Sequence, residues 1–135
     1  MGKFRTCARL NLMLTEVQSR VKGIVESFPE GTATLVLGLH LKLQVRGKPI
    51  GWFMEDHHGD GRLAINCKAL PGMQLSMVQA NSEVYHVSSY VGNKGWVGIW
   101  LDVPGVDWDE VRTLLYDAYL LAAPKSLLKK LPPAQ

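Results

Sequence analysis

The histidines and aspartates at residues 56–60 form the segment that most resembles a catalytic or metal-binding site. His57 and His58 stand between Asp56 and Asp60, and imidazoles with carboxylates bind divalent metal ions. Adjacent histidines on a strand point to opposite faces, and Asp60-Gly61 is typical of a hairpin turn. We therefore expect a polar hairpin tip without a cofactor. A metal-dependent enzyme centred on His57, His58 and Asp60 is the alternative.

The short motifs of nucleophilic and nucleotide-dependent enzymes are absent from the sequence. It has no G-x-S-x-G elbow, no G-x-G-x-x-G fingerprint and no P-loop lysine. Ser88-Ser89 has no recognisable base beside it. We therefore expect a protein that is not an enzyme.

Cationic and aromatic side chains suggest a different chemistry, the binding of nucleic acid. Phosphates pair with cations, and unpaired bases stack on aromatic rings. Alternation along the expected strands places several cations on one wet face, with two tryptophans that would share it and two lysines in turns at its rim. The candidate nucleic-acid-binding residues are Lys42, Arg46, Arg62, Lys68, Trp96 and Trp100, with Lys48 and Lys94 in the turns.

Two other interpretations of this face remain open. In the first, the tryptophans lie under a helix and the cations only keep an open sheet face hydrated. In the second, the face is the contact surface of a homodimer or of a chaperone-like interaction module. The leading hypothesis is a non-enzymatic domain that contacts DNA or another nucleic acid.

The composition is that of one globular domain. The 135 residues are 47% hydrophobic and 20% charged, with a formal net charge of +3, which permits an acidic partner but does not require one. Apolar runs stay below the roughly 18 residues that span a bilayer, so we expect no membrane partner. Cys7 and Cys67 have no metal-binding spacing. Cys67 lies in an apolar alternation, which favours a buried thiol and a cytoplasmic protein, although a disulfide is not excluded by the sequence.

The expected helices and strands follow from changes in the spacing of apolar residues along the sequence. Thr15 begins a helix that ends near Pro29, and alternation from Thr34 onwards predicts an antiparallel meander. One part of the meander has Leu39, Leu41, Leu43 and Val45 alternating with His40, Lys42, Gln44 and Arg46. Another has Ile50, Trp52 and Met54 alternating with Gly51, Phe53 and Glu55.

The second half of the chain predicts a short helix over 71–80, strands near 84–87 and 96–101, and a helix that Asp107 caps and Pro124 ends. This order predicts an α+β fold, a two-layer sandwich with a mainly antiparallel sheet and helices at both ends. We expect an arm over 1–14, a single domain over 15–131 and a flexible tail over 132–135.

Several stretches of the sequence form a recognisable pattern. They are 90–92 and 94–98 with Leu101-Asp102, 106–111, Ala118-Tyr119, 122–125, and 47–49 with 55–62. In these stretches the chain resembles the MmcQ/YjbR family. The resemblance covers roughly Val17 to Leu128. It implies a small bacterial cytosolic protein whose fold is similar to secretion chaperones and to a double-wing DNA-binding domain. Family members are described as DNA-binding largely by fold analogy, and the resemblance supplies no catalytic residues.

Overall fold

A computed structural model describes residues 16–36, 40–55, 62–88 and 94–131. The expected arm, the tail and the 56–60 segment lie outside the described residues. An N-terminal helix over residues 16–26 precedes the other elements. These are β1 (Gly31–Val36), β2 (His40–Val45), β3 (Lys48–Glu55), β4 (Leu63–Cys67), α2 (Met73–Ala80), β5 (Tyr85–Val87), β6 (Val97–Trp100), α3 (Trp108–Ala122) and α4 (Lys125–Leu128).

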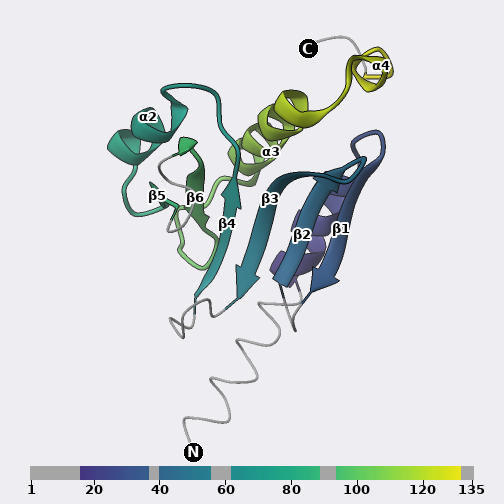
Figure 1. Cartoon of the computed structure of the whole chain (residues 1–135). Coiled ribbons are helices and arrows are strands. Elements are labelled where there is room, and N and C mark those ends of the chain that lie inside the picture. The colour runs from purple at the N-terminus through teal and green to yellow at the C-terminus, as the bar shows by residue number, and fades with distance from the viewer. Residues whose placement is uncertain (1–15, 37–39, 56–61, 89–93, 132–135) are drawn as a thin grey trace, which may run out of the picture.

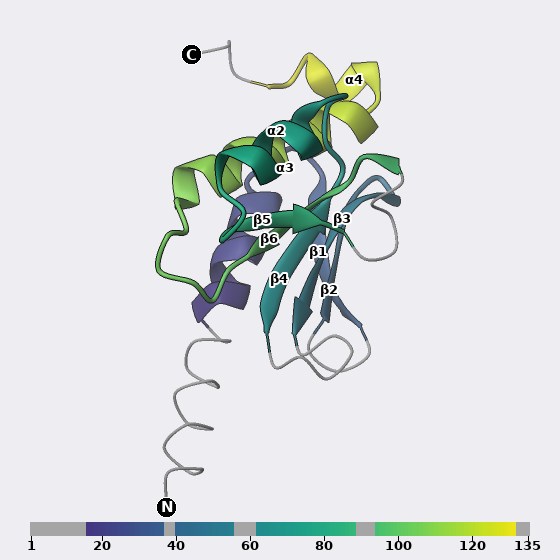
Figure 2. The same cartoon turned by 90° about the vertical axis from the view of Figure 1, so that its left-hand side faces the viewer.

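The described strands form one antiparallel sheet in the order β1-β2-β3-β4-β6-β5. The N-terminal helix and α3 lie behind this sheet in Figure 1, and the view turned by 90° shows both on the same side of the strands (Figure 2). Helix α2 contacts β5 and β6. The prediction of a two-layer α+β sandwich is therefore confirmed, and the sheet is antiparallel throughout its described strands.

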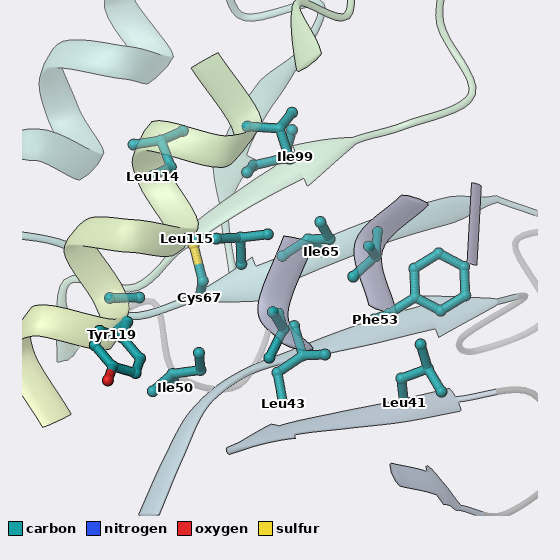
Figure 3. Packing of buried hydrophobic residues seen from close by; sticks show 14 of the residues in the cluster. Leu41, Leu43, Ile50, Phe53, Ile65, Cys67, Ile99, Leu114, Leu115 and Tyr119 are labelled. Carbon is teal, nitrogen blue, oxygen red and sulfur yellow. The ribbon is translucent and has the colours of Figure 1, made fainter. Parts of the chain in front are cut away.

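The hydrophobic core lies between the sheet and the two large helices, the N-terminal helix and α3 (Figure 3). One row of cross-strand neighbours runs through it, with Leu41 opposite Phe53, Phe53 opposite Ile65, and Ile65 opposite Ile99. Since side chains alternate between the faces of a strand, this row fixes which face of the sheet is buried.

Helix α3 begins and packs as its sequence pattern predicts. The Asp107 carboxylate accepts hydrogen bonds from the backbone N–H groups of Asp109 (3.0 Å) and Glu110 (3.4 Å), which satisfies two donors that the helix leaves unpaired. The buried face of the helix continues to Ala122, whereas Leu121 is 45% exposed. The cap and the apolar stripe thus orient α3 on the sheet.

The turn between β2 and β3 differs from the sequence-based prediction. Arg46 and Gly47 both have positive φ, at 47° and 78°, as the two central residues of a type I′ hairpin require. Glycine at the second of these positions adopts that φ without strain. The prediction that Lys48 lies in the turn was therefore wrong, because the turn is Arg46-Gly47 and Lys48 is the first residue of β3. The placement of Arg46 on the wet strand face was wrong, because Arg46 belongs to the turn.

A β-bulge in β3 decides which side chains leave the core. Leu43 lies opposite Gly51, but Gln44 lies opposite Pro49, so Ile50 is the extra residue. Without it, Trp52 would face Leu41 in the core, since a shift of one residue exchanges the two faces of a strand. With it, Ile50 and Phe53 are both fully buried, and Trp52 points to the opposite face.

The Cys67 thiol is free and buried, as the apolar alternation predicted. Burial, with a smaller contribution from the negative charge of Asp117, raises the pKa of Cys67 from 9.0 to about 12. The thiol therefore loses its proton above about pH 9 in the unfolded chain but only near pH 12 in the folded chain. Because ionisation favours the unfolded chain over this range, the thiol's contribution to stability is fully present below about pH 9 and decreases as the pH rises.

We expect ionisation of this thiol in the unfolded chain to lower the free energy of unfolding by about 1.4 kcal/mol between about pH 8 and about pH 10. Urea denaturation at both pH values measures the loss. The Cys67→Ala variant is the control, and its stability should fall less over the same interval by about that amount. An equal fall in both proteins would show that Cys67 does not carry the linkage.

Candidate nucleic-acid interface

The second face of the sheet points away from the N-terminal helix and α3. One row across it runs from Lys42 to Trp52, Asn66, Gly98 and His86 on five neighbouring strands. A second row joins Met54, Ala64 and Trp100. We call the surface made by these eight residues the open face. Among the described elements, the two large helices leave it uncovered (Figures 1 and 2).

Lys42 and Trp52 form the first cation–aromatic pair of the open face. They are cross-strand neighbours, and the Lys42 ammonium lies 5.7 Å from the centroid of the indole ring. Both side chains are partly exposed. At this distance the ring quadrupole attracts the cation without fully desolvating it. The pair thus presents a positive charge beside a planar aromatic surface.

Trp100 is held in a stack on the same face. The His86 ring lies nearly parallel to it, with centroids 4.0 Å apart and planes 21° apart. The Arg62 guanidinium carbon lies 3.8 Å from the indole centroid. Asp102 fixes this arginine through contacts of 3.1 Å and 3.5 Å, and it also accepts the backbone N–H of Leu63 at 3.1 Å. His86 and Arg62 therefore cover the two faces of the Trp100 ring, and the Arg62 side chain remains 37% exposed.

Gly98 allows this stack to form. A β-carbon at position 98 would lie 2.2 Å from Nε2 of His86, closer than two unbonded atoms approach. The His86 ring can therefore lie over the strand only because residue 98 has no side chain. Between the two tryptophans, the small Ala64 and the buried Asn66 form the floor of the open face.

The predicted site residues divide into two groups. Lys42, Arg62 and Trp100 come together on the open face. Arg46 does not join them, because its guanidinium lies 2.8 Å from the Glu30 carboxylate and hydrogen bonds Ser126 at 3.2 Å. The hydrogen bond from Arg46 also lowers the pKa of Glu30. This arginine therefore joins the β2–β3 turn to the start of β1 and to α4.

The remaining predicted residues lie outside the two rows of the open face. Lys68 follows β4 and is partly exposed, while Lys48 and Lys94 are exposed. Trp96 precedes β6, is partly exposed, and its carbonyl accepts a hydrogen bond of 2.7 Å from the Gln74 side chain. Lys48 lies opposite the buried Val45, so its side chain is on the helical side of the sheet, and none of these four residues belongs to the two rows.

Sequence reasoning missed Trp52 as a site residue. Strict alternation placed it with Ile50 and Met54, and the bulge separates Trp52 and Met54 from Ile50. No short motif marks such a bulge. A signal was nevertheless present, because Pro49 cannot donate a hydrogen bond to a regular ladder and is often found at bulges.

The proposed metal ligands His57, His58 and Asp60 lie outside the described residues. In the described ranges, no three His, Cys, Asp or Glu side chains gather as a metal site would require. Likewise, no helix of those ranges has the length and apolar character of a membrane span.

Comparisons with known proteins identify the family. The YjbR family model matches residues 20–121, whereas the search of curated proteins gave no match. A solved structure, the Deinococcus radiodurans protein DR2400 with its DUF419 domain, is similar with a TM-score of 0.66 and 21% identity. The alignment covers 85% of this chain and 88% of that one, and at this identity it supports the fold alone. The match over residues 20–121, which is most of the sequence, shows that the chain belongs to the YjbR family.

Proposed function

We propose that the chain is a non-enzymatic protein that binds single-stranded nucleic acid, DNA above all, on its open face. The observation that carries the proposal is that Lys42–Trp52 and Arg62–Trp100 lie on the sheet surface opposite the helix over 16–26 and α3. Phosphates bind cations without regard to sequence, and unpaired bases stack on aromatic or guanidinium planes.

Each group has a distinct part in this proposal. Trp52 is the stacking platform for a base, because Trp100 is already covered by His86 and Arg62. The Arg62 guanidinium, whose side chain is 37% exposed, provides a second stacking position. Lys42 binds a phosphate beside Trp52, and Lys68 and Lys94 extend the positive charge along the strand of nucleic acid.

Single-stranded nucleic acid is favoured over a duplex by the shape of the surface. A sheet with half-exposed aromatic rings offers planes to unstacked bases. Double-helical DNA instead hides the faces of its bases and is read through its grooves, most often by a helix or a β-ribbon. Both large helices of this chain have their apolar faces in the core.

The test is a titration of a fluorescein-labelled oligothymidine between about 50 and 200 mM salt. We expect binding that weakens steeply with salt. The variant Lys42→Glu should bind about tenfold more weakly at low salt, and the slope of log K against log salt should shrink by about 0.7.

Lys129→Glu is the matched control, because it makes the same charge change at an exposed residue just after α4. It should bind nearly as the parent does. Binding that is absent at low salt, or that does not respond to salt, would contradict the proposal. So would equal losses in both variants, which would indicate attraction by net charge alone.

A further inference from the structure

The strand β1 forms one edge of the sheet and has a composition suited to pairing. In the strand order of the described residues it has β2 on one side and no strand on the other. Its six residues, Gly-Thr-Ala-Thr-Leu-Val, contain neither a charge nor a proline. The backbone N–H and C=O groups of such an edge are a template for another strand.

The six described residues of β1 carry no lysine, proline or bulge that would protect the edge. Natural edge strands carry lysines, prolines or bulges, or they are very short. The opposite edge meets this expectation, because β5 has only three residues and α2 lies against it. By contrast, β1 pairs with β2 in an unbroken register over all six residues, and its Leu35 is 56% exposed.

The sequence of β1 is self-complementary in an antiparallel pair. A two-fold axis perpendicular to the sheet at Thr34 keeps the faces matched, because opposite residues then differ by an even number of positions. Thr34 would meet Thr34 of the second copy, and Leu35 would meet Ala33. Within each pair the two side chains lie on the same face of the sheet, and cross-strand Thr–Thr pairs stabilise an antiparallel sheet.

A shallow groove of mixed polar and apolar character runs beside β1 on the helical side of the sheet. It has a volume of about 210 Å³ and is lined by Ala33, Leu35 and Leu41 of the sheet and by Gln18, Ser19 and Lys22 of the N-terminal helix. Lys22 pairs with Glu26 on that helix at 3.8 Å. The axis at Thr34 would place the two N-terminal helices antiparallel to each other on the same side of the joined sheet.

We propose that β1 pairs with β1 of a second copy of this chain, giving a dimer with one continuous antiparallel sheet. The two open faces then lie on the same side of that sheet, since the axis is perpendicular to it. Thr34 is the neighbour of Lys42 on β2, so the two surfaces meet across the new strand pair. The dimer rests on β1 alone and does not depend on nucleic acid.

Light scattering during size-exclusion chromatography tests the dimer. The parent chain should show twice its monomer mass of 15.0 kDa, with a fraction that rises with concentration. Leu35→Lys should be monomeric, because it places two cations near the axis. Leu75→Lys is the control, since Leu75 is a 61% exposed leucine on α2, and it should remain dimeric. A monomeric parent, or a dimer that survives Leu35→Lys, would overturn the proposal.

Disulfide cross-linking tests the pairing register of the two β1 strands and does not depend on how stable the dimer is. In a Cys7→Ser background, Thr34→Cys places two thiols across the axis at a Cα separation of about 4.5 to 5.5 Å, within disulfide range. Oxidation should yield a covalent dimer rapidly, while Thr32→Cys, which faces Val36 of the second copy, should not. Equal rates for the two variants would contradict pairing at β1.

Discussion

Replacing Tyr119 with alanine is expected to lower the free energy of unfolding by about 3 to 5 kcal/mol. Tyr119 is completely buried and is the largest of the fully buried side chains. Its ring packs against Phe28 at 5.2 Å, and its hydroxyl donates a 2.7 Å hydrogen bond to the carbonyl of Pro29. The residue thus connects α3 to the segment where the N-terminal helix turns into β1.

The conservative variant separates the two contributions of Tyr119. Tyr119→Phe keeps the ring and removes only the hydroxyl, so it should cost about 1 kcal/mol. Urea denaturation followed by circular dichroism measures both variants. If the alanine variant were no less stable than the phenylalanine variant, the ring would not carry the packing assigned to it.

Replacing Trp52 with alanine is expected to weaken binding of single-stranded nucleic acid by about ten- to a hundredfold. Loss of one base–aromatic stack costs about 1 to 3 kcal/mol. The ring is only partly buried, so the fold should survive the change, which a thermal melt would check. Fluorescence anisotropy with an oligothymidine measures the affinity.

Trp52→Phe is the control for stacking, because it retains a smaller aromatic plane at the same place on β3. It should keep much of the affinity that Trp52→Ala loses. An alanine variant that binds as tightly as the parent would remove Trp52 from the site. If both variants lost affinity equally, the indole would be needed for something other than stacking.

The fold could be predicted largely from periodicity and end signals. The Asp107 cap, the stripe of α3 and the alternation of β2 are local properties of the sequence, and each is present in the structure. The partner of the Tyr119 hydroxyl could not be predicted in this way. It is the Pro29 carbonyl, 90 residues earlier in the chain, which the packing of α3 brings to the tyrosine.

The candidate site was harder to predict because one extra residue decides its composition. Ile50 is the bulge that sends Trp52 to the open face and Phe53 into the core. The hairpin turn likewise takes Arg46 off the strand and brings it to Glu30. Both effects depend on how two strands pair, which alternation within one strand does not reveal.

The stacking of Trp100 could not be predicted from sequence patterns either. Its neighbours His86, Arg62 and Asp102 come from separate parts of the chain. Only the strand order, with β6 between β4 and β5, places them together. The tryptophan expected to stack on a base is therefore already stacked within the protein, and Trp52 takes that place in the proposed interface.

The most direct test of the open face as the binding surface is an NMR titration of isotope-labelled protein with unlabelled oligothymidine at low salt. Binding at the open face should shift the Trp52 indole N–H and backbone amides in β2, β3 and β6, and these shifts should grow with added oligonucleotide and be reversed by salt. Shifts confined to the helical layer, for example around Arg20 and Arg112, with Trp52 unchanged, would contradict it.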